Sequence, residues 1–243
     1  MPHDHAGEGR GGTRSRLLAV LTGKSTPFGP NGEPSGIGKR PCLGKLYVQK
    51  DGIVGDEQGD KLHHGGVDKA IHHYAFDHYP AWRSDCPDAA GLFERPGTFG
   101  ENFSSVGLTE RNVCVGDIFQ VGTAVLQVSQ ARQPCWKLNV RTSMADMAMK
   151  VQVSGRTGWY YRVIDPGWIR KGDEIRLLQR PNPEWPLQRV LQCLYLKGVD
   201  HECLCEMADL LFLSNSWRKL AQVRLERSAI EDWSERLDVP EKT

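Results

Sequence analysis

Residues 126–139 read L-Q-V-S-Q-A-R-Q-P-C-W-K-L-N, and an alternating apolar segment that begins at Ala124 leads into them. Alternation of apolar and polar side chains predicts a β-strand with one buried face. The strand must end before Pro134, because proline has no N–H group for the hydrogen bonds of a sheet. The sequence therefore predicts a strand that delivers a short, chemically distinctive segment at its end.

Cys135 follows Pro134 directly, with Arg132 three residues before it and Lys137 two residues after it. Positive charge on both sides favours the thiolate, which is the form of cysteine that binds metals and attacks electrophiles. A small, buried core residue is the commonest role of a free cysteine. The local sequence leaves both roles open.

The bulk properties are those of an ordinary globular protein. The chain has 243 residues, 39% hydrophobic and 25% charged, with a formal net charge of +1. This balance argues against a nucleic-acid-binding protein and against a polybasic membrane anchor. No apolar run is long enough to span a bilayer, and the first residues lack the apolar segment of a signal peptide. We therefore expect a cytoplasmic protein without membrane contact.

Seven cysteines at irregular spacings suit a reducing compartment better than a disulfide framework. Cys203 and Cys205 lie near His201, but one intervening residue is too few for the usual zinc-ligand loop. We expect these two cysteines to be structural.

Short apolar segments separated by glycine turns fill the chain as far as about Arg180, and they predict a β-barrel or sandwich. From Pro186 onward the apolar residues follow helical spacing in three segments. We predict a disordered tail over residues 1–14, a mainly β domain over 15–180 and a three-helix subdomain over 181–243. The helices are expected to stabilise the fold or to form a homodimer.

Several polar side chains lie in loops or at strand ends, where binding residues commonly occur. Lys24 and Lys39 bracket a glycine- and proline-rich loop and are candidates for binding phosphate, as is Arg156 in a glycine-flanked turn. Glu101 and Asn102 lie in the turn-rich segment P-G-T-F-G-E-N-F, residues 96–103. Solvated surface positions, or the stabilisation of a turn, are the alternative roles.

Four histidines occur as two adjacent pairs, His63–His64 and His72–His73. Adjacent residues of a strand point to opposite faces of the sheet, so at most one member of each pair can face a shared site. We expect one inward histidine from each pair to bind a ligand.

Three segments together resemble the MOSC-domain proteins of the YiiM type. They are Q-x-R-x-P-C-W-K-L-N at 130–139, V-G-D-I-F-Q-V-G-x-A-V-L-Q-V at 115–128 and S-G-R-T-G-W-Y-Y-R-V at 154–163. The resemblance covers roughly residues 15–243 and implies a MOSC-type β-barrel with peripheral helices. It implies that Cys135 is the protein ligand to molybdenum, that His64 and His73 are the inward histidines, and that Asn139 belongs to the same site.

The resemblance further implies reduction of N-hydroxylated compounds, such as N-hydroxylated purines, by a molybdenum cofactor. A redox cofactor is needed because no side chain stores two electrons at a workable potential. The pterin phosphate of molybdopterin would be bound by Lys24, Lys39, Arg132 and Arg156, since guanidinium groups suit phosphate. No G-x-G-x-x-G motif opens a helix after a strand, so we expect an external flavoprotein reductase to supply electrons.

Two other functions remain open. Cys135 can serve as the carrier of a persulfide in the assembly of metal-sulfur cofactors, because that role needs the same reactive thiolate. A protein that binds molybdenum cofactor without turning over a substrate is the other alternative, since a fold does not fix a function.

Overall fold

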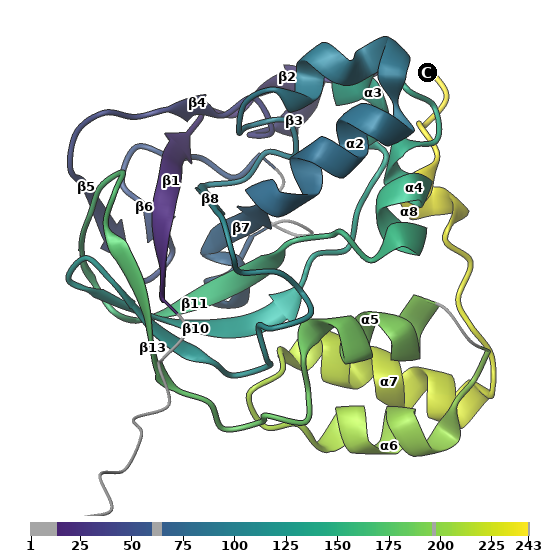
Figure 1. The fold of residues 1–243 in the computed structure, drawn as a ribbon. Coiled ribbons are helices and arrows are strands. Elements are labelled where there is room, and N and C mark those ends of the chain that lie inside the picture. The colour runs from purple at the N-terminus through teal and green to yellow at the C-terminus, as the bar shows by residue number, and fades with distance from the viewer. Residues whose placement is uncertain (1–13, 60–64, 196–197, 243) are drawn as a thin grey trace, which may run out of the picture.

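The structure is a computed structural model that describes residues 14–59, 65–195 and 198–242 (Figure 1). Eight strands form its main sheet in the order β13-β9-β10-β11-β7-β8-β1-β4, and β13 also pairs with β1. That pairing closes the first seven of these strands into a barrel, while β4 extends the upper end of β1. Neighbours are antiparallel except β7 and β8, which are parallel. The predicted MOSC-type β-barrel is confirmed.

The barrel strands are β1 (Arg14–Thr22), β7 (Ile71–Ala75), β8 (Phe103–Ser105), β9 (Ile118–Val121), β10 (Ala124–Ala131), β11 (Trp159–Asp165) and β13 (Glu174–Gln179). The remaining strands lie around it: β2 (Thr26–Phe28), β3 (Glu33–Ser35), β4 (Arg40–Pro41), β5 (Leu46–Gln49), β6 (Gly52–Ile53) and β12 (Gly167–Ile169). Strands β12, β5 and β6 form a small sheet, and β2 and β3 form a hairpin.

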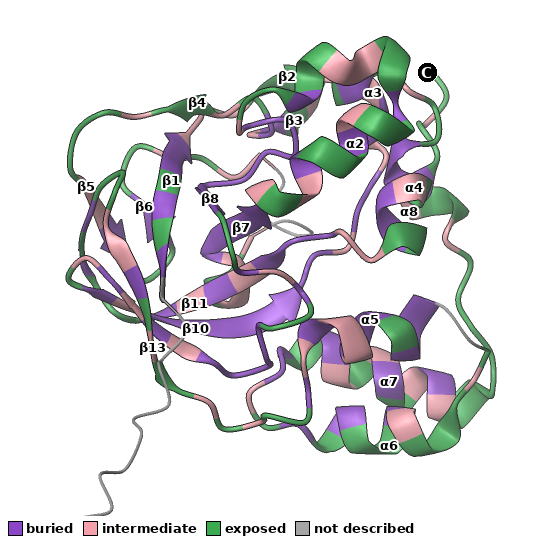
Figure 2. Cartoon of the chain, in the orientation of Figure 1, coloured by how far each residue is buried: buried purple, intermediate pink, exposed green. Residues whose placement is uncertain are grey.

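The barrel forms where side chains alternate between its interior and its outside. On β10, Leu126 and Val128 are fully buried, and Phe119 of β9 and Tyr161 of β11 join them in the interior. Each such side chain contributes about 1.5–3 kcal/mol by leaving water. Figure 2 shows β10 almost entirely buried, because other elements also cover its outer face.

Short helices cover one side of the barrel around a second apolar cluster. They are α2 (Tyr79–Asp85), α3 (Lys137–Thr142) and α4 (Met147–Ser154), with 3₁₀ turns at Val67–Lys69, Phe76–His78 and Pro87–Phe93. Tyr74 stacks on Phe99 in this cluster with ring centroids 3.9 Å apart. Trp82 and Leu138 are buried beside them. The cluster fixes loop 96–103 and helix α3, both of which line the candidate site.

Three helices follow the barrel: α5 (Leu187–Tyr195), α6 (His201–Asp209) and α7 (Asn215–Arg227). Asp200 caps α6, since its carboxylate accepts a hydrogen bond from the Cys203 N–H at 3.1 Å. Their buried residues, such as Leu194 and Trp217, belong to the same apolar cluster as the barrel interior. The three predicted helices are confirmed. A short helix that the sequence did not predict, α8 (Ser234–Leu237), lies in the segment that follows them.

Among the helices described here, none combines the length and the apolar character needed to cross a membrane.

Candidate functional site

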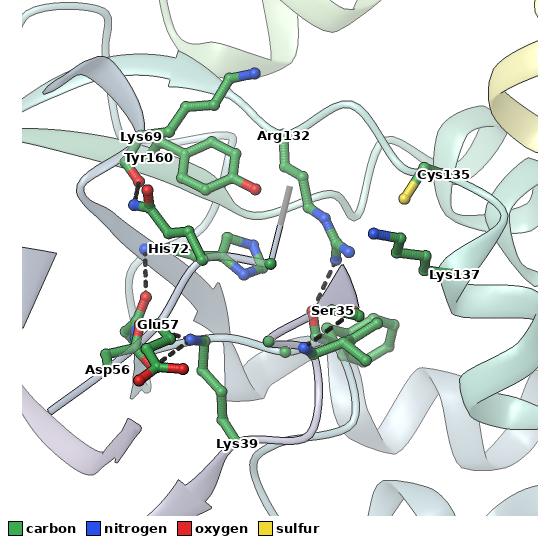
Figure 3. Close-up of a pocket in the computed structure, with 17 residues that line it drawn as sticks. Ser35, Lys39, Asp56, Glu57, Lys69, His72, Arg132, Cys135, Lys137 and Tyr160 are labelled. Carbon is green, nitrogen blue, oxygen red and sulfur yellow. Dashed lines mark hydrogen bonds and ion pairs between the residues drawn. The ribbon is translucent and has the colours of Figure 1, made fainter. Parts of the chain in front are cut away.

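The candidate site begins where β10 ends. Arg132 still pairs with β11 through its N–H, which donates to the Gly158 carbonyl at 2.9 Å. Pro134 then turns the chain out of the sheet, and Lys137 begins α3. The residues between them form an elbow, residues 132–137, that presents Arg132, Cys135 and Lys137 to one pocket (Figure 3). Cys135 is only 7% exposed, but it lines this pocket.

Gly158, just before β11, allows the chain to pack closely against β7. Its φ angle is +74°, a conformation that side chains disfavour. A Cβ atom built there would lie 2.4 Å from the His73 carbonyl oxygen and 2.9 Å from the His72 Nε2 atom. Gly158, the second glycine of the segment S-G-R-T-G-W, is therefore required by close packing against β7.

The pocket is rich in positive charge. Among the residues that the structure describes, four cationic side chains line it, those of Lys39, Lys69, Arg132 and Lys137, against two carboxylates, those of Asp56 and Glu57. Figure 3 shows the Arg132 guanidinium and the Lys137 amine close together beside Cys135. Arg132 donates to the Phe99 carbonyl at 3.0 Å, and Lys137 donates to the Pro34 carbonyl at 2.8 Å. Because these two cations donate to backbone carbonyls, which carry no net charge, the pocket suits an anion.

Asp56 organises the opposite wall and was not among the predicted residues. Its carboxylate accepts two hydrogen bonds from the Lys39 amine, at 2.5 and 2.6 Å. It also accepts from the Gly23 N–H and from the Asn102 side-chain amide, both at 2.8 Å. Both members of the ion pair are almost buried, with side-chain exposures of 7% and 8%. Asp56 therefore fixes Lys39 and Asn102 in the wall of the pocket.

The structure places His72, and not His73, at the pocket. His73 points into the barrel, where its ring contacts the Tyr161 hydroxyl at 3.0 Å and the Ser105 hydroxyl at 2.8 Å. The predicted alternation holds for this pair, but the choice of His73 is corrected, because the barrel interior encloses that side chain completely. Burial lowers the pKa of His73 to about 3, so this histidine is neutral.

His72 lines the pocket as a second neutral histidine. Burial, followed by the positive charge of Arg132, lowers the pKa of His72 well below its usual value. Its Nε2 atom is buried and has no hydrogen-bond partner in the structure. The aromatic ring of Tyr160 lies 5.0 Å away between centroids.

The two neighbours Glu101 and Asn102 have different roles. Asn102 lines the pocket, and its carbonyl oxygen accepts from the His72 N–H at 3.0 Å. Glu101 is turned into its own loop, where it accepts from the Tyr79 hydroxyl at 2.6 Å and from the N–H groups of Gly97 and Phe99 at 2.7 and 3.1 Å. Burial raises the pKa of Glu101, and these hydrogen bonds oppose that rise. Glu101 thus shapes the loop rather than the pocket surface.

Three further predicted residues do not line this pocket. Lys24 is exposed and pairs with Glu57 at 2.9 Å. Asn139 ties α3 to α4 and to the Leu237 carbonyl, at 2.7 and 2.8 Å. Arg156 stacks on Trp82, with its guanidinium carbon 3.6 Å from the ring centroid, and pairs with Asp85. His64 lies outside the described residues.

Of the predicted residues, the structure thus brings together Lys39, Asn102, Arg132 and Cys135. Other polar residues that line the pocket were not predicted as binding residues, although Lys137 was noted as a charge beside Cys135; they include Asp56, Lys69, His72, Lys137 and Tyr160. Lys137 lies in segment 130–139 and Tyr160 in segment 154–163, both of which carry the family resemblance. Membership of these segments is the signal in the sequence that could have indicated the two residues. Nothing in the local sequence distinguishes Asp56 from other loop aspartates.

The pocket opens beside Cys135 into a larger cleft. The inner pocket has a volume of about 80 Å³, and the outer cleft has a volume of about 940 Å³. Both are lined by Lys69, Cys135, Lys137 and Tyr160, so the thiol lies where they meet. Trp136 and Trp233 also line the outer cleft. Its volume is in the range that organic ligands occupy, roughly 300–1,000 Å³.

Comparison with known protein families now identifies the class of protein. The MOSC domain model matches residues 60–176, and the model of the YiiM-like, 3-alpha helix domain matches residues 185–227. Protein YiiM of Escherichia coli (strain K12) is 40% identical over 218 residues, which cover 90% of this chain and 96% of that protein. The chain therefore belongs to the MOSC-domain family and, within it, to the YiiM-like proteins.

Other relatives agree with this assignment. A protein named reductase from Gibberella moniliformis (strain M3125 / FGSC 7600) is 37% identical over 196 residues, which cover 80% of this chain but only 35% of that longer protein. The crystal structure of YiiM from Escherichia coli has a TM-score of 0.77 at 34% identity, covering 91% of this chain and 98% of that one. A crystal structure of a protein described as hypothetical has a TM-score of 0.82 at 36% identity, covering 93% and 96%.

The residues of the site fit a molybdenum cofactor. In residues 14–59, 65–195 and 198–242 no three histidine, cysteine or acidic side chains meet to hold a metal ion. A metal at Cys135 would thus have one protein thiolate and would take its other ligands from the cofactor. Thiolate is a soft ligand of the kind that binds such metals. The surplus of cations among the described residues of the inner pocket fits the phosphate.

Proposed function

We propose that the protein reduces N-hydroxylated compounds, such as N-hydroxylated purines, to the amine and water with a molybdenum cofactor. The observation that carries the proposal is the position of Cys135, at the junction of a cationic inner pocket and an outer cleft of organic-ligand size. The relative named reductase supports an oxidoreductase function. When bound, the cofactor supplies the two-electron redox chemistry that side chains lack.

The chain's own residues would bind and orient the cofactor. Cys135 would supply the thiolate ligand, and Lys39, Arg132 and Lys137 would bind the phosphate in the inner pocket. Lys39 is fixed for this role by Asp56, and Arg132 by the Phe99 carbonyl. Asn102, which lines the inner pocket, would offer a hydrogen bond to the cofactor. Trp136 and Tyr160 would offer flat apolar surfaces to a planar substrate in the outer cleft.

Reduction of the N–O bond consumes two electrons and two protons and gives the amine and one water molecule. We infer that the electrons come from a separate flavoprotein reductase, because the sequence has no recognisable flavin or nicotinamide motif. The neutral His72 near the pocket would not add a further positive charge there, since burial holds its pKa low.

The test is elemental analysis and turnover in matched cysteine variants. Protein from a molybdenum-replete host should contain about one molybdenum per chain, and Cys135→Ser should contain little. The free energy of unfolding of Cys135→Ser should differ from that of wild type by only about 0.5–3 kcal/mol. With a competent reductase, wild type should reduce an N-hydroxylated purine and Cys135→Ser should not. Cys205→Ser, at an exposed position, is the matched control and should behave as wild type.

The same experiment separates the alternatives. A persulfide carrier would contain no molybdenum, and sulfur bound to Cys135 would be released by reductant. A delivery protein would contain molybdenum without turnover. Full activity in Cys135→Ser would contradict all three functions, since each depends on this thiol.

A further inference from the structure

After α7 the chain returns to the barrel through residues 228–242, a segment that lies outside both family matches. Figure 1 shows this return segment in yellow, running from α7 to α8 beside α4. Its start is anchored by Arg224, which is buried in α7. The Arg224 guanidinium donates to both carboxylate oxygens of Glu231, at 2.8 and 2.7 Å, and to the Leu194 carbonyl of α5 at 2.6 Å.

At the other end of the return segment, Arg236 holds the backbone on both sides of Cys135. The Arg236 guanidinium donates to the carbonyl of Pro134, which precedes the cysteine. The Arg236 carbonyl accepts from the N–H of Trp136, which follows the cysteine, at 2.8 Å. The second guanidinium nitrogen donates to the Gln152 side chain of α4 at 2.6 Å, so the arginine is itself oriented.

This contact adds to the support that the elbow has from its own backbone. The carbonyls of Cys135 and Trp136 accept from the N–H groups of Leu138 and Asn139, both at 2.9 Å, but Pro134 has no N–H and lies beyond the end of β10 at Ala131. A residue whose side chain must bind a metal or reacting group needs to be held within about 0.5 Å by its surroundings. The return segment adds two bonds at the two peptide groups that flank Cys135.

We propose that Arg236 is a positioning residue for Cys135, and that α5 and α7 serve to anchor the strap that carries it. The strap comprises residues 231–237. Arg224 of α7, which also bonds the Leu194 carbonyl of α5, fixes one end of the strap through Glu231, and Arg236 at its other end fixes the thiol. The purpose of the fixed thiol rests on the proposed function, but the positioning itself does not.

The test measures the alkylation rate of Cys135 by iodoacetamide in full-length protein prepared in molybdate-free medium. The modified peptide is quantified by mass spectrometry, with the exposed Cys205 as internal reference. Arg236→Met should raise the Cys135 rate roughly tenfold, because losing a charge-assisted hydrogen bond makes local opening more frequent. Arg236→Lys keeps a donor for the Pro134 carbonyl and should return the rate to within about threefold of wild type.

The matched control is Arg218→Met. Arg218 also donates to a backbone carbonyl, that of Ala208 at 3.0 Å, but within the helices and away from the elbow. Its loss should lower the melting temperature without changing the Cys135 rate. A wild-type rate in Arg236→Met, an equal rise in Arg218→Met, or a lysine variant as fast as the methionine variant would each overturn the proposal.

A second variant covers the case in which Arg236→Met does not fold. Gln152→Leu leaves Arg236 in place but removes the side chain that orients it, and it should give an intermediate rise; no rise would overturn the proposal. Absence of molybdenum in wild type would end the proposed function and leave the alkylation result standing. An unchanged alkylation rate would remove the positioning role and leave the molybdenum test intact.

Discussion

His73 is a fully buried titratable side chain in the interior of the barrel. Its ring nitrogens contact the hydroxyls of Tyr161 and Ser105, and it lies 4.4 Å from the Trp159 ring between centroids. A neutral imidazole satisfies both hydroxyl contacts, whereas a charged one would be desolvated, and none of these three neighbours carries a carboxylate to compensate it. His73 alone is therefore enough to make the stability of the whole barrel depend on pH.

The folded protein should lose stability as the pH falls from about 6.5 to about 3. Above pH 6.5 His73 is neutral in both states and imposes no penalty; below it the unfolded chain binds a proton that the folded chain does not bind until its pKa of about 3. The loss should reach on the order of 4 kcal/mol. His73→Gln, which keeps a donor and an acceptor, should reduce the slope of unfolding free energy against pH.

Denaturant unfolding at several pH values measures this slope, with the exposed His201→Gln as control. The slope should be reduced rather than abolished, because the pKa of buried His72 is also lowered. An identical pH dependence in His73→Gln and wild type would contradict the prediction.

Asp56 supports a second prediction at this scale. Asp56→Asn should destabilise the fold by about 3–5 kcal/mol, because it leaves the buried Lys39 amine without its carboxylate partner. The double variant Asp56→Asn with Lys39→Met should recover part of that loss, since the unpaired charge is then gone. The free energy of unfolding is the measurement. Lys24→Met removes the nearby exposed pair with Glu57 and should change it by less than about 1 kcal/mol. Equal losses of unfolding free energy in Asp56→Asn and Lys24→Met would contradict the prediction.

At the scale of elements, loop 96–103 depends on Glu101. Glu101→Ala removes the acceptor for the hydrogen bonds from Tyr79, Gly97 and Phe99, so residues 96–103 should exchange amide hydrogens faster and the protein should lose about 2–4 kcal/mol of stability. Tyr79→Phe removes one of these donors and leaves the two backbone bonds, so its effect should be smaller. Hydrogen exchange resolved by peptide distinguishes the two variants. Unchanged exchange in Glu101→Ala would show that the aromatic cluster alone holds the loop.

The same elements show how far the sequence reaches. The strand before Pro134, the elbow and the three helices follow from local patterns, because alternation, proline and helical spacing are properties of neighbouring residues. Alternation also separated His72 from His73, but it could not say which face of β7 is covered by the barrel. That choice depends on the pairing of β7 with β11 and β8, which are distant in sequence.

Glu101, Asn102, Arg156 and Lys24 illustrate a second limit. All four lie in loops or turns, and each finds a partner that only the folded chain brings near: Tyr79, Asp56, Trp82 and Glu57. Lys39 lines the pocket and Lys24 does not, because Asp56 holds the first while Glu57 holds the second near solvent. Long-range ion pairs therefore decide which of these two lysines lines the pocket.

At the scale of the whole molecule, the proposed function makes this chain one component of an electron-transfer pair. Purified to homogeneity, the protein should show no reduction of an N-hydroxylated purine with NADH or NADPH alone. Addition of a flavoprotein reductase should restore turnover, since no G-x-G-x-x-G motif of the sequence opens a helix after a strand. Oxidation of NADH is followed by absorbance and amine formation by chromatography. Turnover with pyridine nucleotide alone would contradict the need for a partner.

The pairing of β13 with β1 has a consequence for synthesis of the protein. Arg14 pairs with Arg176, so the barrel stays open until the ribosome has released residues 174–176. At roughly 5–20 residues per second, β1 must wait about 10–30 s for its final neighbour. During translation the free edges of β1 and β9 are open to pairing with other chains. A nascent chain that stalls before residue 174 thus exposes the two edges that the finished barrel conceals.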